Sequence, residues 1–187
     1  MKISVIGMGY IGLPTAAVLA SRKINVVGVD VNHDVVDTIN KGNIHIVEPE
    51  LDILVRSVVQ AGYLRSTTQP VKADVFMVAV PTPFKDENKP DLSYIEAASK
   101  AIAPVLEKGN IVILESTSPV GTTEKMMGWM QEIRSDLTFP IFGTDGSETD
   151  ISVAHCPERV LPGHVIRELV ENDRIIGGVT SQCANKA

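Results

Sequence analysis

The sequence Lys2-Ile3-Ser4-Val5-Ile6-Gly7-Met8-Gly9-Tyr10-Ile11-Gly12 starts with an apolar, β-branched run of strand length and continues directly into a Gly-x-Gly-x-x-Gly motif. Residues 14–22 have helical composition, and residues 25–29 form a second apolar run that ends on Asp30. A strand, a glycine-rich turn, a helix and a second strand followed by an acid together predict a dinucleotide-binding βαβ unit.

Each glycine of the motif has its own mechanical role. Gly7 permits the tight turn out of the strand, and Gly9 lets a pyrophosphate approach the backbone. Gly12 allows the helix to pack close to the strand. The helix N-terminus then offers unpaired N–H groups and a partial positive charge to the phosphates.

Asp30 predicts which cofactor binds. It lies 18 residues after Gly12, near the spacing of the acid that binds a ribose 2′-hydroxyl. Because a carboxylate there would repel a 2′-phosphate, NAD is favoured over NADP. Two other interpretations are a plain glycine-rich turn with Asp30 as a solvated acid, and a Rossmann-like S-adenosylmethionine site. The third glycine of the motif, Gly12, favours the dinucleotide.

Composition excludes several classes of protein. The 187 residues suffice for one full core, and the net charge of −6 comes without a basic cluster, which argues against nucleic acid and anionic membranes as partners. Apolar runs such as 75–80 are too short to span a bilayer, and the N-terminus enters a strand without a signal peptide. Cys156 and Cys183 make no disulfide framework, so a cytoplasmic location is expected.

Strand and helix patterns alternate along the chain, which predicts an α/β, Rossmann-like, doubly wound sheet, mostly parallel and covered by helices on both faces. Residues 1–187 form one domain in this interpretation. Asn32, Asp91 and Ser118 are predicted helix N-caps. Polar loops are expected at 85–90 and, with acidic character, at 143–150. Strands are expected at 2–6, 25–29, 64–68, 75–80, 111–114, 139–142, 151–155 and 174–178, and helices at 14–22, 32–40, 51–61, 91–106 and 119–134, with a helical turn at 165–170.

Ligands of such sheets bind at the carboxyl ends of the strands. Besides the glycine motif and Asp30, this rule selects the polar segments 81–84, 115–119 and 156–163. Pro81 and Thr82 form either a platform beside the adenosine half of the cofactor or a simple strand terminator.

The segment Glu115-Ser116-Thr117-Ser118 presents hydroxyl groups to the nicotinamide end. Ser118 precedes a proline, so it is assigned mainly to capping the next helix. Thr117 is the stronger functional candidate, and the role of Glu115 stays open.

The segment after residue 155 carries a thiol, a carboxylate and a guanidinium. Cys156 is either a nucleophile or, as most single cysteines are, inert. Glu158 is either a general base or the ion-pair partner of Arg159. No metal is expected, because none of the four histidines has metal-ligand spacing; they are His33, His45, His155 and His164.

Four motifs in this order resemble the UDP-glucose/GDP-mannose dehydrogenase family over essentially the whole chain. They are Gly7-Met8-Gly9-Tyr10-Ile11-Gly12-Leu13-Pro14, Val80-Pro81-Thr82-Pro83, Glu115-Ser116-Thr117-Ser118-Pro119-Val120-Gly121 and Pro157-Glu158-Arg159-Val160-Leu161-Pro162-Gly163. The last motif and residues 45–49 look most like members that act on UDP-N-acetyl-D-mannosamine.

The resemblance implies that a UDP-sugar C6 hydroxyl is oxidised to a carboxylate by two NAD⁺ through a cysteine thioester. It implies catalytic roles for Thr117, which helps to position a water, and Glu158, the base for thioester hydrolysis. The implied cofactor contacts are Gly7, Gly9, Tyr10, Ile11, Gly12, Asp30, Pro81, Thr82, Ser116 and Thr117, and the implied sugar contacts are Glu158, Arg159, Val160 and Leu161.

The chain departs from the family pattern at two positions and in length. Val35 stands near the place of an arginine that reaches the cofactor phosphates in some relatives, and Pro162 replaces a second loop glutamate of the UDP-glucose enzymes. By the resemblance, the middle helical domain, the C-terminal substrate domain, the catalytic lysine and asparagine and the nucleophilic cysteine lie beyond residue 187. The fragment is then expected to be monomeric and inactive, and the whole enzyme homodimeric.

Two alternatives stay open. The chain is a stand-alone Rossmann module that senses NAD(H) without catalysis, or it is the domain of a UDP-GlcNAc or UDP-glucose 6-dehydrogenase. A sensor has no need of Glu115, Thr117 and Glu158 at the ends of strands.

Overall fold

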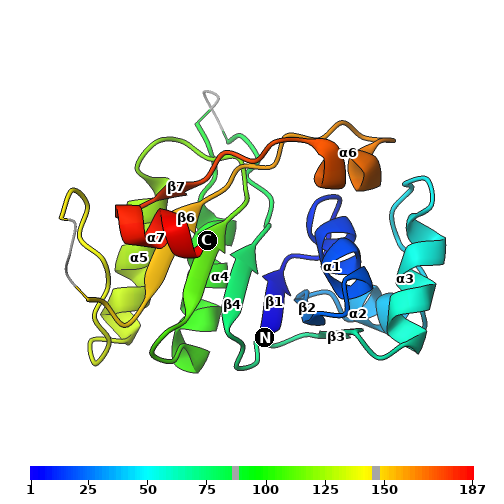
Figure 1. Ribbon diagram of the computed structural model, residues 1–187, viewed down its shortest axis with the longest axis horizontal. Helices are drawn as coiled ribbons and strands as arrows, with labels where there is room; N and C mark the ends of the chain where they lie inside the picture. Colours follow the sequence, from blue (N-terminus) through cyan, green and yellow to red (C-terminus); the bar gives the residue numbers. More distant parts are fainter. Residues whose placement is uncertain (86–88, 145–147) are drawn as a thin grey trace.

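A single β-sheet organises residues 1–85, 89–144 and 148–187, the part of the chain that the computed structural model describes (Figure 1). Six neighbouring strands pair in parallel, and the last strand pairs antiparallel with β6. The predicted mostly parallel, doubly wound sheet is therefore confirmed. In spatial order the strands are β3 (Leu64–Thr67), β2 (Asn25–Val29), β1 (Lys2–Ile6), β4 (Val75–Val78), β5 (Ile111–Leu114), β6 (Ser152–His155) and β7 (Gly177–Gly178).

Helices connect most of the successive strands, with β3 and β4 as the exception, and cover both faces of the sheet (Figure 1). In the described ranges none is long and apolar enough to cross a membrane. The helices are α1 (Gly12–Ser21), α2 (His33–Asn40), α3 (Leu51–Gln60), α4 (Ser93–Ile102) with the 3₁₀ turn η2 (Ala103–Val105), α5 (Thr122–Ile133), α6 (Val165–Glu171) and α7 (Ser181–Lys186).

The continuous apolar run of β4 serves two cores. Val75 and Met77 pack on the side of α1 and α3, whereas Phe76 and Val78 pack on the side of α4 and α5. Because side chains alternate between the faces of a strand, a sheet that is covered on both faces needs apolar residues at every position.

The strand order reverses between β1 and β4. The chain passes from β1 outward through β2 and β3, then returns to β4 on the other side of β1 and continues outward to β7. In open α/β sheets such a reversal leaves a crevice at the carboxyl ends of the two central strands, which is where ligands bind. The segments 7–12 and 79–82 follow these two ends directly.

Two element predictions were wrong in the C-terminal half of the chain, and one helix was missed. Residues 139–142 form no strand: Pro140 lacks an N–H donor, and Ile141 and Phe142 are exposed. The last strand is limited to Gly177–Gly178, and the short helix α7 was not predicted. The predicted loops at 85–90 and 143–150 each include residues outside the described ranges.

The three predicted helix caps have different outcomes. Asn32 caps α2 as predicted, because its Oδ1 accepts the N–H of Asp34 at 2.9 Å. Asp91 accepts the Ser93 N–H at 2.9 Å, but the N-cap position itself is Leu92. Ser118 is not a cap: α5 begins at Thr122, after Gly121 with φ +87°.

Gly12 lets α1 pack directly against the turn that follows β1. A Cβ at Gly12 would lie 1.7 Å from the carbonyl oxygen of Gly7, and one at Gly7, where φ is +90°, would lie 2.8 Å from the carbonyl oxygen of Ala79. By contrast, a Cβ at Gly9 would have no neighbour within 4 Å. Gly7 and Gly12 are therefore fixed by packing of the protein itself, and Gly9 is not.

We predict that Gly12→Ala lowers the free energy of unfolding by about 3 kcal/mol or more, because backbone must move to admit the methyl group. Gly128→Ala is the matched control: it lies within α5 with open space around it, so a gain of about 0.5–1 kcal/mol is expected. Urea denaturation measures both. Equal stabilities of Gly12→Ala and the wild type would contradict the packing argument.

Candidate functional site

A cavity of about 550 Å³ lies at the carboxyl ends of the central strands. Most of the predicted site residues line it, although they come from five separate segments. Gly12, Arg159 and Leu161 do not line it: Gly12 is buried at the start of α1, and the other two are exposed. The lining residues are Gly7, Gly9, Tyr10, Ile11, Asp30, Ala79, Val80, Pro81, Thr82, Glu115, Ser116, Thr117, Glu158 and Val160.

The start of α1 is a place for phosphate. The residue at its N-cap position, Ile11, makes no side-chain capping bond. Leu13 donates its N–H to the carbonyl oxygen of Gly9 at 3.1 Å, whereas the amides of Gly9, Tyr10 and Ile11 make no such backbone bond among the described residues. Gly9 lines the cavity and leaves its own Cβ direction empty. A pyrophosphate can therefore reach these N–H groups without steric conflict.

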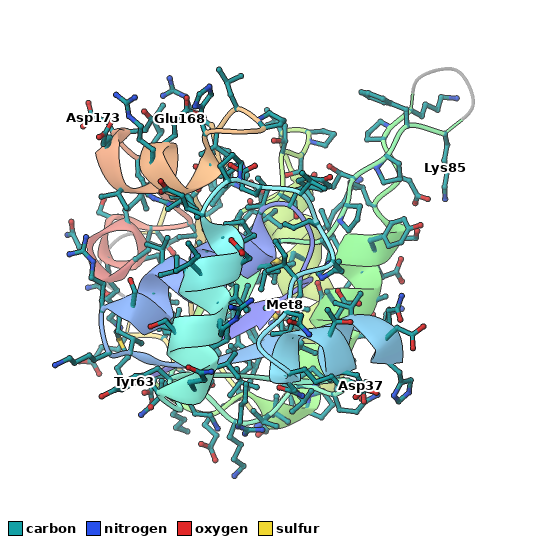
Figure 2. The ribbon with its side chains drawn as sticks, turned by 90° about the vertical axis from the view of Figure 1, so that its right-hand side faces the viewer. Met8, Asp37, Tyr63, Lys85, Glu168 and Asp173 are labelled. Carbon is teal, nitrogen blue, oxygen red and sulfur yellow. The ribbon has the colours of Figure 1, made fainter. Side chains whose placement is uncertain are left out.

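Asp30 is held in place by backbone donors on both sides. Its Oδ2 accepts the N–H of Met8 at 3.0 Å, and its Oδ1 accepts the N–H of Asn32 at 2.9 Å. Met8 is fully buried (Figure 2), and a Cβ at Gly28 would collide with its side chain. The acid is thus oriented at the end of β2, and no Lys or Arg of the described residues lines the cavity to bind a 2′-phosphate.

Hydroxyl groups tie the β4 and β5 ends of the cavity together. The Thr82 hydroxyl donates to the carbonyl oxygen of Thr117 at 2.6 Å, and the Ser116 hydroxyl donates to that of Val80 at 2.6 Å. Both groups brace the wall of the cavity. Thr117 itself is exposed, so its hydroxyl is the one that faces a ligand most freely.

Glu158 pairs with an arginine that sequence analysis missed. Arg174 Nη1 lies 2.9 Å from Glu158 Oε2 as an ion pair, and it donates to Glu115 Oε1 at 3.4 Å. Arg159, the predicted partner, offers only its backbone N–H, at 3.0 Å from Glu158 Oε1. The alternative pairing of Glu158 with the Arg159 side chain is therefore wrong. No motif signalled Arg174, which lies on an irregular segment before β7.

Glu115, whose role the sequence leaves open, is a buried carboxyl group with incomplete hydrogen bonding. Its side chain is fully buried, and its Oε2 has no hydrogen-bond partner among the described residues. Burial raises the pKa of Glu115 to about 7; Arg174 opposes the rise, and Glu158 adds to it. A carboxyl group that titrates near neutrality therefore lies directly behind the cavity.

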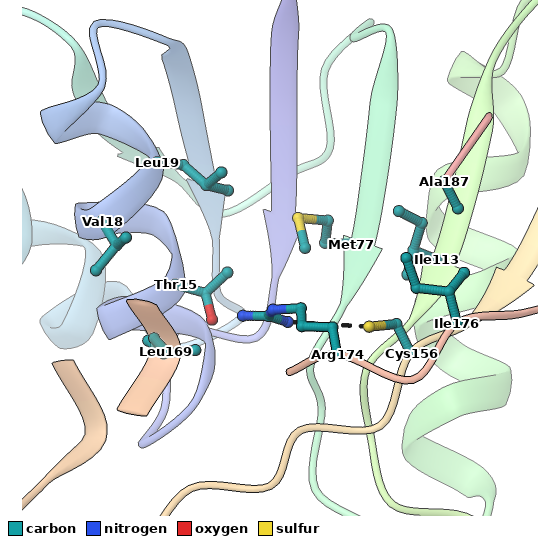
Figure 3. A pocket seen from close by; sticks show the side chains of 10 residues that line it. All are labelled: Thr15, Val18, Leu19, Met77, Ile113, Cys156, Leu169, Arg174, Ile176 and Ala187. Carbon is teal, nitrogen blue, oxygen red and sulfur yellow. Dashed lines mark hydrogen bonds between the residues drawn. The ribbon is translucent and has the colours of Figure 1, made fainter. Parts of the chain in front are cut away.

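Cys156 is not placed as a nucleophile. It is 5% exposed, and burial raises the pKa of its thiol despite the nearby Arg174 guanidinium. It lines a different cavity of about 240 Å³, where Arg174 lies between Thr15 and Cys156 (Figure 3). The inert interpretation fits this environment better.

Glu48 anchors the loop that carries Glu158. Its two carboxylate oxygens accept the N–H groups of Gly163 at 2.9 Å and Val165 at 2.8 Å, across more than 100 residues of sequence. Glu168, on α6, accepts the N–H of Leu161 at 2.7 Å (Figure 2). Residues 45–49 and 157–163, which were separate motifs in the sequence, therefore form one structural unit.

Comparison with known proteins gives the family. The model of the UDP-glucose/GDP-mannose dehydrogenase family, NAD binding domain, matches residues 1–187. The chain belongs to this family. The cavity fits NAD in the respects that the structure tests: an open Gly9, an uncapped start of α1, an oriented Asp30 and no lining cation.

Relatives within this dehydrogenase family agree with the assignment. The UDP-N-acetyl-D-mannosamine dehydrogenase of Campylobacter jejuni is 68% identical over all of this chain and 46% of its own length. The NDP-N-acetyl-D-galactosaminuronic acid dehydrogenase of Ralstonia nicotianae is 66% identical over 99% of this chain and 43% of its own. The structure of a UDP-D-ManNAc dehydrogenase from Pyrococcus horikoshii superposes with a TM-score of 0.90 at 43% identity, covering 100% of this chain and 43% of that one.

This dehydrogenase domain therefore spans less than half the length of the relatives it matches. Within the described ranges no group of three or more His, Cys, Asp or Glu side chains is arranged to hold a metal ion, and the absence of a metal stays a prediction.

The raised pKa of Glu115 predicts a pH-dependent stability. The folded state holds this proton above the ordinary glutamate pKa of 4.5, so the stabilising effect is complete below that pH and is lost as the pH rises through about 7. We expect the fall in unfolding free energy from pH 5 to pH 8 to be about 2–3 kcal/mol smaller in Glu115→Gln than in the wild type. Urea denaturation at both pH values measures this difference.

The exposed Glu171 gives the control, since Glu171→Gln should leave the pH dependence unchanged. If the Glu115→Gln variant and the wild type lose the same free energy between pH 5 and pH 8, Glu115 is already ionised in the folded protein.

Proposed function

We propose that this chain is the NAD-binding domain of a UDP-sugar 6-dehydrogenase. We further propose that the whole enzyme converts UDP-N-acetyl-D-mannosamine to the corresponding uronic acid, a precursor of surface polysaccharide. The observation that carries this proposal is the single cavity that joins Asp30 and the α1 N-terminus to Thr117 and Glu158. The family membership and the names of the relatives support it.

The proposed reaction balances as R–CH₂OH + H₂O + 2 NAD⁺ → R–COO⁻ + 2 NADH + 3 H⁺. NAD⁺ supplies the hydride acceptor for each of the two oxidations. In this proposal Asp30 binds the ribose, and the amides of Gly9, Tyr10 and Ile11 bind the pyrophosphate. Thr117 and Glu158 then lie at the reacting end, where Thr117 orients a water and Glu158 accepts its proton.

The thioester step needs a thiol, and none of the described residues places one in the cavity, because Cys156 is buried in a different one. We therefore propose that the nucleophile and the substrate-binding domain come from further sequence. The whole enzyme would act as a cytoplasmic homodimer, and this domain alone would be a monomer with no nucleic-acid partner.

A stand-alone NAD(H) sensor is the second candidate. It requires the cofactor contacts alone and gives no purpose to a buried ion pair that holds Glu158 at the cavity. Other sugars of the same class, such as UDP-GlcNAc or UDP-glucose, are alternatives for the substrate. The first of these is compatible with every contact described above.

We predict that the chain binds NAD⁺ at least about tenfold more tightly than NADP⁺, and that Asp30→Ala weakens NAD⁺ binding by a similar factor. Isothermal titration calorimetry measures both. Asp30→Asn keeps an acceptor for the Met8 amide but removes the negative charge. It therefore distinguishes the effect of the charge on binding from the effect of losing the hydrogen bond that holds the loop. Asp37→Asn, an exposed acid on α2, is the control. Equal affinity for the two cofactors would contradict the assignment of Asp30.

We also predict that the purified chain makes no NADH from UDP-N-acetyl-D-mannosamine, whereas the longer protein does so with two NADH per sugar. Absorbance at 340 nm follows the reaction, and UDP-GlcNAc and UDP-glucose serve as competing substrates. Turnover by residues 1–187 alone would refute the fragment proposal. NAD⁺ binding without turnover by the longer protein on any UDP-sugar would favour the sensor.

A further inference from the structure

Glu115, Glu158 and Arg174 form an ionic cluster at the wall of the cavity. One nitrogen atom of Arg174 lies close to both acids and to Cys156. Nη1 of Arg174 is 2.9 Å from Glu158 Oε2, 3.4 Å from Glu115 Oε1 and 3.9 Å from Cys156 Sγ. The side chains of Glu115 and Glu158 are 0% and 8% exposed. Nη1 donates a hydrogen bond to Glu115, whereas its contact with Glu158 is an ion pair, because Glu158 Oε2 has no hydrogen-bond partner among the described residues. The two acids are buried, and the Arg174 side chain is 33% exposed.

The charges of this cluster do not cancel when both acids are ionised. One guanidinium then faces two carboxylates, and Glu115 Oε2 has no partner among the described residues. An uncompensated buried charge is unfavourable, so one carboxyl group tends to hold a proton. The raised pKa of Glu115 agrees with this. Burial is the largest influence and raises the pKa, Arg174 lowers it, and Glu158 raises it further.

The three elements that meet here are β5, the loop after β6 and the segment before β7. Arg174 reaches the cluster from the side of the second cavity, where its chain lies with Leu169 and Ile176 (Figure 3). It does not line the proposed NAD cavity, whereas Glu115 and Glu158 do. Its effect on a bound ligand must therefore pass through these two acids.

We propose that Arg174 is a positioning residue that holds the Glu158 carboxylate at the edge of the cavity, and that Glu115 controls this hold by competing for the same guanidinium nitrogen. When Glu115 is protonated, Nη1 is left to Glu158; when Glu115 is ionised, the nitrogen is shared. The geometric part stands on the cluster alone, and its catalytic consequence rests on the proposed function.

The test on this chain uses nuclear magnetic resonance with ¹³C-labelled glutamate. Three-bond couplings report the χ1 rotamer of Glu158, and the Glu115 carboxyl signal, assigned with Glu115→Gln, reports its titration. In the wild type we expect one fixed rotamer of Glu158. Arg174→Met should average the couplings of Glu158 and move the Glu115 midpoint up by about one pH unit or more. Glu158→Gln should move the Glu115 midpoint down.

The control is Arg167→Met, since Arg167 is exposed and pairs with Glu171 on α6. It should change neither reading. If Arg174→Met does not fold, Arg174→Lys replaces it, and a partly averaged Glu158 is expected. Two results would overturn the proposal. One is unchanged Glu158 couplings in the folded Arg174 variant, and the other is a Glu115 titration midpoint that stays the same in Glu158→Gln.

Kinetics of the longer protein test the catalytic consequence. Arg174→Met should lower kcat about 10- to 100-fold and leave the KM for NAD⁺ within about threefold, because the cofactor contacts are untouched. Adding Glu115→Gln should restore part of kcat, since it removes the second buried carboxylate. An arginine that only packs the fold gives no such rescue, and that outcome would overturn the catalytic part.

The two proposals fail differently. A wild-type longer protein that reduces no NAD⁺ with any UDP-sugar refutes the proposed function. In that case the rotamer and titration readings still decide whether Arg174 holds Glu158.

Discussion

The contact between Gly12 and the carbonyl oxygen of Gly7 is the constraint on which the rest of the site depends. With 1.7 Å between that oxygen and any added Cβ, α1 can start only where a glycine stands. The start of α1 is thereby fixed against the end of β1, and the turn before it, residues 9–11, lines the cavity. Asp30 completes the arrangement from β2 by binding the Met8 amide. The contacts that pack α1 against the end of β1 are therefore the same contacts that shape the proposed cofactor site.

Buried acids organise the opposite side of the cavity, and they do so in two ways. Glu48 is satisfied, because both of its oxygens accept backbone N–H groups of the loop that follows β6. Glu115 is not satisfied, because its Oε2 has no hydrogen-bond partner among the described residues. A buried carboxylate with complete hydrogen-bond partners can fix a loop, whereas burial without them favours the protonated form. The loop that carries Glu158 is therefore held at its far end by Glu48, and its near end lies beside Arg174.

Sequence reasoning succeeded where the information is local. Strand-length apolar runs predicted the parallel sheet, and the glycine spacing with Asp30 predicted residues that the structure brings to one cavity. It failed at Ser118, which was predicted as a helix cap, because a turn ending in Gly121 precedes the helix instead. It also failed at 139–142, where Pro140 interrupts strand pairing. Arg174 could not be found this way, because its partner Glu115 is 59 residues distant and no periodicity links them. Contacts of that kind follow from the fold, and the fold must be known first.

The carbon atom at which the sugar is oxidised bears on which residues have to tell related sugars apart. Two relatives that match this domain at 68% and 66% identity carry names for different amino sugars, mannosamine and galactosamine. These sugars differ in configuration at C2 and C4, while a uronic acid is made at C6. In the proposed enzyme, a domain that binds NAD and presents Thr117 and Glu158 to the C6 end would meet the same atoms in both sugars. Discrimination between epimers needs contacts to the ring hydroxyl and acetamido groups, each of which contributes about 1–3 kcal/mol when a buried partner is left unpaired. Glu158 and Val160 are the loop residues that line the cavity. Glu158 is assigned to the reaction in the proposed function, Val160 is apolar, and Leu161 is exposed. Neither Val160 nor Leu161 can hydrogen-bond a hydroxyl through its side chain, so these two residues offer no means of telling the epimers apart.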